Sequence, residues 1–311
     1  MNTKKRNNEP IDNIAELPKD WWKRENAARI LSHWFINHTV ALHVNYEIDG
    51  KICGQTYTGF LLYYHERYMW VTAGHVIEDI DKLLKCDFCK VLGFKWVDNY
   101  EIDIAKAIPV DYERSPKCGI NNKEIDLGIV GLEFLDIKAI SAKNKNPWLT
   151  SKIWKNNHLA NPDGYYVVGY PAEVVELKSS MGSAGTNCEL KISLVCIPVE
   201  RIKPEKPAHT ENFWGHPGWF YGKILPVTRE DGEYFDSISG MSGGPILSLE
   251  RTPGGNIKYR LFAIQSGWLS QSKILCGTPI ERVVELLDKT FEAVDKKADG
   301  DKCKERDKDA G

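Results

Sequence analysis

Residues 240–245 read Gly-Met-Ser-Gly-Gly-Pro, and this stretch predicts a tight turn that presents the hydroxyl of Ser242. Gly240 can adopt backbone conformations closed to other residues, which lets the turn close around the serine. The amides of Gly240 and Ser242 would then converge on one spot and stabilise an oxyanion that develops there. Ser, Gly and Pro also form ordinary turns, so a chemical role for this stretch depends on partners elsewhere in the chain.

The first partner is a histidine at the end of an expected strand. Residues 68–76 read Tyr-Met-Trp-Val-Thr-Ala-Gly-His-Val, an apolar run that passes through small residues to His75. A rigid sheet can aim an imidazole placed there. Histidine is the side chain whose unperturbed pKa suits a general base near neutral pH. The other histidines lie in no comparable setting, and we interpret them as structural or surface groups.

The second partner is an acid that opens an apolar, β-rich run. Asp126 stands at the start of such a run at 126–132, and Asp103 has the same local pattern within 101–105. A carboxylate in this position accepts the Nδ1–H of the histidine and fixes its tautomer. We favour Asp126 because the longer separation from His75 leaves room for the intervening strands. Asp103 stays open as the alternative.

The order histidine, aspartate, serine along the chain is the chymotrypsin order, and here the chain resembles the trypsin/chymotrypsin-like serine proteases. The resemblance spans about residues 38–285. It implies an all-β fold of two six-stranded antiparallel β-barrels, and a triad of His75, Asp126 and Ser242. It further implies peptide hydrolysis through an acyl-enzyme, with no cofactor and no metal. The matching motifs are residues 72–75, 126–129, 240–245 and 261–268.

The resemblance also implies how substrate is held. Residues 261–268 are similar to the strand that pairs with substrate backbone, which places Ser266 and Trp268 among the substrate-binding residues. Asp236 lies shortly before the serine, where the trypsin subgroup has an aspartate at the floor of its primary pocket. Such a carboxylate pairs with Lys or Arg of a substrate. Trp268 stands where a glycine is usual and would narrow the pocket entrance, so both a basic and a non-basic preference stay open.

Three residues depart from the secreted digestive enzymes of that family. Val76 and Ile238 replace disulfide cysteines, and Met241 replaces the aspartate that pairs with a freed N-terminus on activation. The chain therefore resembles the bacterial or intracellular members. A catalytically silent protease-like module that binds peptides or regulates a partner is the rival hypothesis, and an esterase of the same fold is a third.

Composition limits the class of protein and the kinds of partner to expect. The chain has 311 residues, 42% of them hydrophobic, and a formal net charge of −2. These values are typical of a globular protein and give no reason to expect nucleic acid or a membrane as partner. We find no apolar run of signal-peptide length, so we expect a cytoplasmic location. The oligomeric state stays open.

The chain has eight cysteines, and without export we expect reduced thiols. Cys86 and Cys89 have the CxxC spacing of zinc ligands, but zinc would need two more, with Cys118 the nearest candidate. No second such pair is present in the sequence. Reduced structural thiols are therefore the favoured interpretation, and zinc binding is the alternative.

The pattern along the chain predicts five regions. They are an N-terminal extension with a helix (1–37), a first barrel carrying His75 and Asp126 (38–135), and a connection (136–163). A second barrel with Ser242 and a closing C-terminal helix (164–294) and a disordered charged tail (295–311) follow. We expect strands at 39–47, 56–64, 68–72, 91–97, 101–107, 126–132, 164–170, 190–198, 218–226, 245–250, 257–266 and 274–278.

Overall fold

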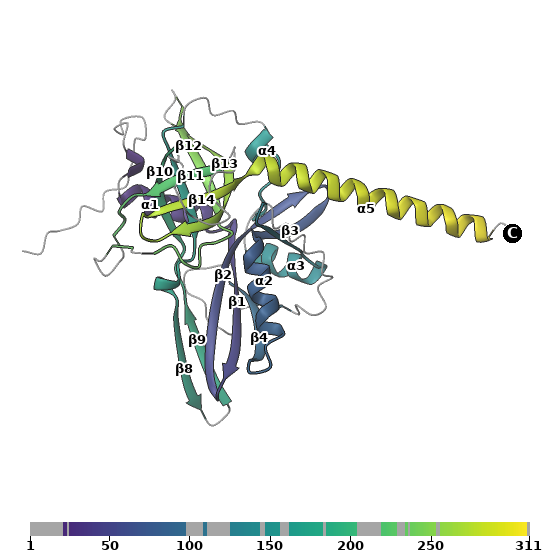
Figure 1. Cartoon of the computed structure of the whole chain (residues 1–311), viewed down its shortest axis with the longest axis horizontal. Helices are drawn as coiled ribbons and strands as arrows, with labels where there is room; N and C mark the ends of the chain where they lie inside the picture. The colour runs from purple at the N-terminus through teal and green to yellow at the C-terminus, as the bar shows by residue number, and fades with distance from the viewer. Residues whose placement is uncertain are drawn as a thin grey trace, which may run out of the picture.

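The computed structural model shows a mostly β protein with a long C-terminal helix (Figure 1). It describes residues 21–23, 25–97, 108–110, 125–143, 147–155, 162–182, 185–203, 219–228, 234–235, 237–252 and 256–309. The expected strand at 101–107, with Asp103, lies outside these residues, and so do Cys118 and Asp236. Among the described helices, none is both long enough and apolar enough to cross a membrane.

The first half is a six-stranded antiparallel sheet. Its order is β5-β4-β1-β2-β3-β6. The pairings of the described residues do not close this sheet into the barrel that we predicted. The strands are β1 (Thr39–Ile48), β2 (Lys51–Tyr64), β3 (Arg67–Ala73), β4 (Lys90–Val97), β5 (Ile108–Val110) and β6 (Leu127–Gly131).

Two tight turns fix the register of this sheet. Asp49-Gly50 joins β1 to β2, and His65-Glu66 joins β2 to β3; all four residues have positive φ. Turns with positive φ at both central residues match the twist of an antiparallel pair. The strands therefore pair directly across each turn, Ile48 with Lys51 and Tyr64 with Arg67.

The second half contains a closed antiparallel barrel of six strands, in the order β10-β11-β14-β13-β12-β7. This barrel confirms one of the two that the sequence predicts. Between β7 and β10 in the sequence, β8 (Glu176–Gly182) and β9 (Gly185–Lys191) form a separate hairpin. We expected no strand in this segment before residue 190. The barrel strands are β7 (Gly164–Gly169), β10 (Val195–Arg201), β11 (Phe220–Ile224), β12 (Pro245–Arg251), β13 (Ile257–Leu269) and β14 (Ile274–Pro279).

Along the chain, the helices precede, connect or follow the strands of these sheets. α1 (Glu25–Phe35) follows a short 3-10 turn η2 (Trp21–Lys23) and contacts β10. α2 (Gly74–Leu84) starts directly after β3, so its first turn carries His75. α3 (Phe134–Lys143) and α4 (Lys152–Lys155) lie within or beside the expected connection at 136–163, and a 3-10 turn η4 (Ala172–Val174) follows β7.

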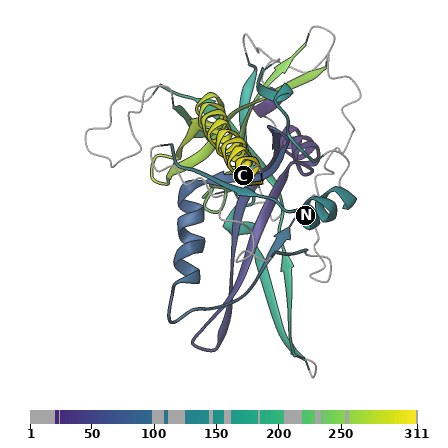
Figure 2. The ribbon, with the colours of Figure 1, turned by 90° about the vertical axis from the view of Figure 1, so that its right-hand side faces the viewer.

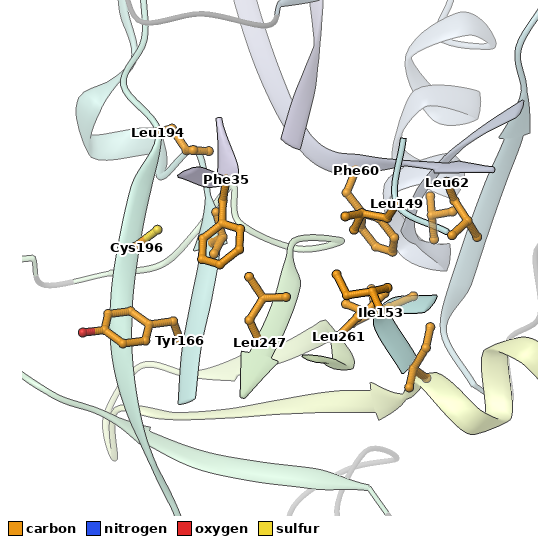
Figure 3. Close-up of a cluster of buried hydrophobic side chains, with 14 of the residues drawn as sticks. Phe35, Phe60, Leu62, Leu149, Ile153, Tyr166, Leu194, Cys196, Leu247 and Leu261 are labelled. Atoms are coloured by element: carbon orange, nitrogen blue, oxygen red, sulfur yellow. The ribbon is translucent and has the colours of Figure 1, made fainter. Parts of the chain in front are cut away.

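The main apolar cluster joins the two halves. It combines side chains of β2, such as Phe60 and Leu62, with Leu247 and Leu261 from the second barrel (Figure 3). Phe35 of α1 is in the same cluster. Burial of such side chains is the dominant favourable term in folding, so the halves and the N-terminal helix share one core.

The last helix, α5 (Ile280–Asp309), is longer than the sequence pattern predicts. Its first turns are anchored in the main cluster by Ile280, Val283 and Leu287, and Asp295 still pairs with Arg67 of β3 at 2.8 Å. The C-terminal part of the helix extends away from the body of the protein (Figure 1), and Figure 2 views it end-on. It runs through the segment that we expected to be a disordered tail. Lys, Glu and Asp are enriched there, and at its start Lys296 forms an i,i+4 pair with Glu292, 3.8 Å away, which favours a helix.

Candidate active site

The serine turn leads directly into β12, contacts the chain that follows β7, and is held by its own backbone. Gly240 has φ +89° and Gly243 has φ +91°, the left-handed region that favours glycine. The Met241 amide donates to the Ile238 carbonyl at 3.0 Å, and the Gly244 amide donates to the Met241 carbonyl at 2.8 Å. The two glycines therefore carry the sharp reversals that the sequence predicts here.

Among the described residues, only some of the backbone amides around Ser242 have a hydrogen-bond acceptor. The Gly243 amide donates to the Gln265 carbonyl on β13 at 2.8 Å, so three of the five amides from Gly240 to Gly244 have acceptors. In the described part of the chain, no acceptor is found for the other two, the amides of Gly240 and Ser242. Backbone N–H groups are normally paired in folded proteins. The two that lack an acceptor are the two that the sequence analysis assigns to an oxyanion.

Thr58 of β2 fastens the turn to the first half. Its hydroxyl donates to the Gly240 carbonyl at 2.6 Å and accepts from the Tyr170 amide, which lies 3.0 Å away. The Ala172 amide donates to the Ser239 carbonyl at 2.7 Å from the same side. One hydroxyl thus bridges the sheet, the end of β7 and the turn that presents Ser242. Sequence reasoning missed Thr58, because a threonine inside an apolar strand carries no signal of such a role.

The turn also packs directly against the strand that leads to His75. A β-carbon added to Gly243 would lie 2.1 Å from Oγ1 of Thr72 and 2.6 Å from its Cα. Only glycine fits at such a distance. Gly243 adjoins Ser242 in the chain, and Thr72 stands three residues before His75 at the end of β3, so the structure brings the serine and histidine segments together across the two halves.

Asp126 holds His75 by two atoms. One carboxylate oxygen, Oδ1, accepts the backbone N–H of His75 at 2.8 Å, and the other, Oδ2, lies 2.9 Å from Nδ1 of its ring. The backbone N–H belongs to the first turn of α2, where Ala73 provides no side-chain cap. Asp126 therefore caps the helix from a distant part of the chain and orients the ring at the same time.

The charge on Asp126 also sets the protonation of the ring. An ionised carboxylate only accepts hydrogen bonds, so Nδ1 carries the proton and neutral His75 keeps the lone pair of Nε2. Burial disfavours the charged imidazole, but the hydrogen bond and charge of Asp126, helped by Asp79 and Glu78, outweigh it and raise the pKa of His75. The ring is suited to accept a proton at Nε2 and to bear the resulting charge.

Asp126 has an unusual backbone, with φ +47°. Aspartate tolerates this left-handed region better than most residues. The preceding carbonyl, that of Ile125, accepts a hydrogen bond from the Thr278 hydroxyl of β14, and Thr278 is itself bonded to Ser266 at 3.0 Å. The second barrel thus holds the strained turn of the first half in place.

Ser242 and His75 make no hydrogen bond to each other. Within the described residues, the Ser242 hydroxyl and Nε2 of His75 each have no hydrogen-bond partner, and the His75 side chain is 37% exposed. Both groups are thus available to a third molecule. Catalytic hydrogen bonds of this type commonly tighten only when substrate binds.

The predicted substrate-binding residues have different surroundings. Ser266 is buried, and its hydroxyl bonds within the protein to Ile264 and Thr278. Trp268 packs, half-buried, against an apolar cluster in the second barrel that includes Ile238 and Met241. Met241 is fully buried there, where an aspartate would be an unpaired charge.

No metal centre is found in the described residues. No group of three or more His, Cys, Asp or Glu side chains there could hold an ion. Five cysteines of the described residues are free thiols: Cys86 is exposed, Cys53 and Cys89 are partly enclosed, and Cys196 and Cys276 are buried.

Comparison with known proteins gives matches among solved structures. No known family model matches the chain, and no curated protein matches it in sequence. The chain is similar to the active form of the Rv3671c protease from M. tuberculosis, with 13% identity, a TM-score of 0.42 and 82% of each chain covered.

Two further matches are proteases as well. One is the protease Anisep from Arthrobacter nicotinovorans, with 15% identity and a TM-score of 0.37, covering 78% of this chain and 90% of that one. The other is the thermostable serine protease AL20 from an extremophilic microorganism, with 14% identity and a TM-score of 0.38, covering 78% and 91%.

The bridging hydroxyl of Thr58 gives a testable prediction. Thr58→Val keeps the side-chain shape but leaves the Gly240 carbonyl and the Tyr170 amide without their partner, so we expect a loss of about 1–3 kcal/mol in the free energy of unfolding. Chemical denaturation measures it. Thr39→Val is the matched control, because the Thr39 hydroxyl is buried without a hydrogen-bond partner in the described part of the chain. That change should be neutral or stabilising, and equal losses in the two variants would contradict the role of Thr58.

Proposed function

We propose that this protein is a serine endopeptidase in which Ser242, His75 and Asp126 act as a triad. One observation carries the proposal. A carboxylate fixes the ring of His75 with Nε2 left free, and the turn that presents Ser242 packs against the strand leading to that ring. A polypeptide is the substrate class that the arrangement suits.

The reaction follows from the roles of these groups. Nε2 of His75 takes the hydroxyl proton as the Ser242 oxygen attacks the peptide carbonyl, and Asp126 stabilises the imidazolium that forms. The protonated ring then gives its proton to the leaving amine, which produces an acyl-enzyme. Water attacks the ester in the same way and releases the acid. Because His75 must start neutral, activity should fall as the pH drops through its raised pKa.

In this mechanism, the backbone amides of Gly240 and Ser242 stabilise the negative charge of the tetrahedral intermediate. The tetrahedral intermediate places negative charge on the former carbonyl oxygen, and we assign its stabilisation to the N–H groups of Gly240 and Ser242, for which the described residues provide no acceptor. Preorganised donors need no rearrangement when the charge appears, and removal of one such donor typically costs about 10²–10³ in kcat. Thr58 binds the Gly240 carbonyl, which belongs to the peptide unit between these two N–H groups in the chain.

The reactive serine provides the direct test of the function. A fluorophosphonate probe should label the folded protein at Ser242, and Ser242→Ala should abolish the labelling, because the probe reacts only with a serine activated by a base. Mass spectrometry of the labelled peptide identifies the site. Ser239→Ala, an exposed serine in the same turn, is the control and should leave labelling intact. If the folded protein is not labelled, the peptidase hypothesis is wrong and the protein is the catalytically silent protease-like module.

The acid can be identified with a pair of asparagine variants. Asp126→Asn keeps an oxygen for the His75 amide but offers N–H to Nδ1, which favours the wrong tautomer, so we expect turnover of a peptide substrate to fall by about 10⁴. Asp103→Asn should change it little. Circular dichroism checks that both variants fold, and a large loss in Asp103→Asn alone would refute the assignment of Asp126.

For substrate preference, we propose cleavage after Lys or Arg with Asp236 as the pairing group. Phe235 and Ile238, which precede and follow this residue in the sequence, are buried in an apolar cluster of the barrel that also includes Met241 beside Ser242. A carboxylate at the floor of a pocket beside the serine would pair with a long basic side chain. Trp268 in the same cluster limits the room available.

A peptide library with the residue before the cleaved bond varied tests this preference. Wild-type protein should cleave after Arg much faster than after Leu or Ala, and Asp236→Ser should remove the difference while fluorophosphonate labelling stays unchanged. If Ala is cleaved as fast as Arg, the basic pocket is refuted. In that case Trp268→Gly should broaden cleavage to larger residues.

A further inference from the structure

Two cysteines that the proposed chemistry does not use lie together at the far end of α2. The helix carries His75 in its first turn and ends at Leu84, and residues 86–89, Cys-Asp-Phe-Cys, form the turn that leads into β4. The Cys89 amide donates to the Cys86 carbonyl at 3.1 Å. This i to i+3 hydrogen bond defines a β-turn, in which the first and last Cα atoms lie less than about 7 Å apart.

That separation suits a disulfide. Bridged cysteines usually have Cα atoms about 4.4–6.8 Å apart, so closing a bond between Cys86 and Cys89 requires little movement of the backbone. Both residues are free thiols in this structure. The turn therefore already brings the two Cα atoms within the range of a disulfide before any bond forms.

The two thiols differ in solvent accessibility. Cys86 is exposed and Cys89 is partly enclosed, and the side chain between them, Phe88, is 85% exposed. Burial, together with the nearby thiols of Cys86 and Cys53, raises the pKa of Cys89. A reagent from solution reaches Cys86 first, and Cys89 is placed to complete the exchange.

We propose that Cys86 and Cys89 are a reversible dithiol–disulfide modification site, oxidised by a small disulfide such as glutathione disulfide. The Cys86 thiolate attacks one sulfur of the reagent and releases one glutathione, which leaves a mixed disulfide. The Cys89 thiolate then attacks Cys86 and releases the second glutathione. The protein loses two protons and two electrons, and the reagent gains them as two thiols.

Two other uses of this pair fit the structure less well. A zinc site would need further ligands, and the described residues provide no group of three that could hold a metal. A thioredoxin-like catalyst activates its attacking thiol through a lowered pKa, for example at a helix N-terminus. The Cys86–Cys89 turn follows the C-terminal end of α2 instead. We therefore expect a site that responds to its redox surroundings and does not catalyse exchange in other proteins.

Peptide mapping of the whole protein tests the proposal cleanly. Lys85 and Lys90 flank the turn, so trypsin releases residues 86–90 as one short peptide that carries both cysteines. The protein is equilibrated with mixtures of oxidised and reduced glutathione, alkylated, unfolded and digested. The peptide should lose two hydrogen atoms and escape alkylation, and a reducing agent should restore both thiols. This readout is independent of any peptidase activity.

The controls distinguish the effect of the folded turn on disulfide formation from the effect of its sequence alone. The free peptide of residues 86–90 is titrated alongside, and the protein should form the bond with an equilibrium constant at least about tenfold larger, about 30 mV for two electrons. Cys53→Ser should leave the bond unchanged, whereas Cys89→Ser should accumulate glutathione on Cys86. An equilibrium constant equal to that of the free peptide, alkylation of both thiols throughout, or a bond to Cys53 would each overturn the proposal.

Discussion

The arrangement of the site depends on one carboxylate that binds two donors of the same residue. Asp126 accepts the backbone N–H of His75 and lies within hydrogen-bond distance of its ring. The first contact fixes where α2 begins, and the second fixes how the imidazole is turned. A charged acceptor at a helix N-terminus is worth about 0.5–2 kcal/mol, so part of the free energy that orients the ring also stabilises the fold.

Threonine hydroxyls join the two halves at this point. Thr58 reaches from the first half to Gly240 and Tyr170, and Thr278 reaches from the second half to the carbonyl beside Asp126. Apolar packing brings the halves together, but it is not directional. Hydrogen bonds have strict distances and angles, and they select which of many packed arrangements places the serine turn against the histidine strand.

The sequence predicts the parts of this protein that have local signals. Alternating apolar residues located most of the strands, and the glycines around Ser242 indicated a turn with positive φ, which Gly240 and Gly243 have. Thr58 and Thr278 had no such signal, because their partners are distant in the chain. The start of α2 at Gly74 was also missed, because its cap comes from Asp126 and not from a neighbouring residue. Residues 295–309 are polar, and polarity alone did not distinguish an extended helix from a disordered tail.

Met241 shows how a single buried residue determines how the turn is held. It is fully buried among apolar side chains of the second barrel, and its amide and carbonyl both take part in the turn. An apolar side chain needs no ionic partner, so the turn does not depend on a charged group arriving from elsewhere in the chain. The positive φ of Gly240 is present together with this packing, and in the described part of the chain the amides of Gly240 and Ser242 have no acceptor. The geometry of the serine turn therefore comes from the burial of Met241 in the barrel combined with the hydrogen bond that Thr58 donates from the first half.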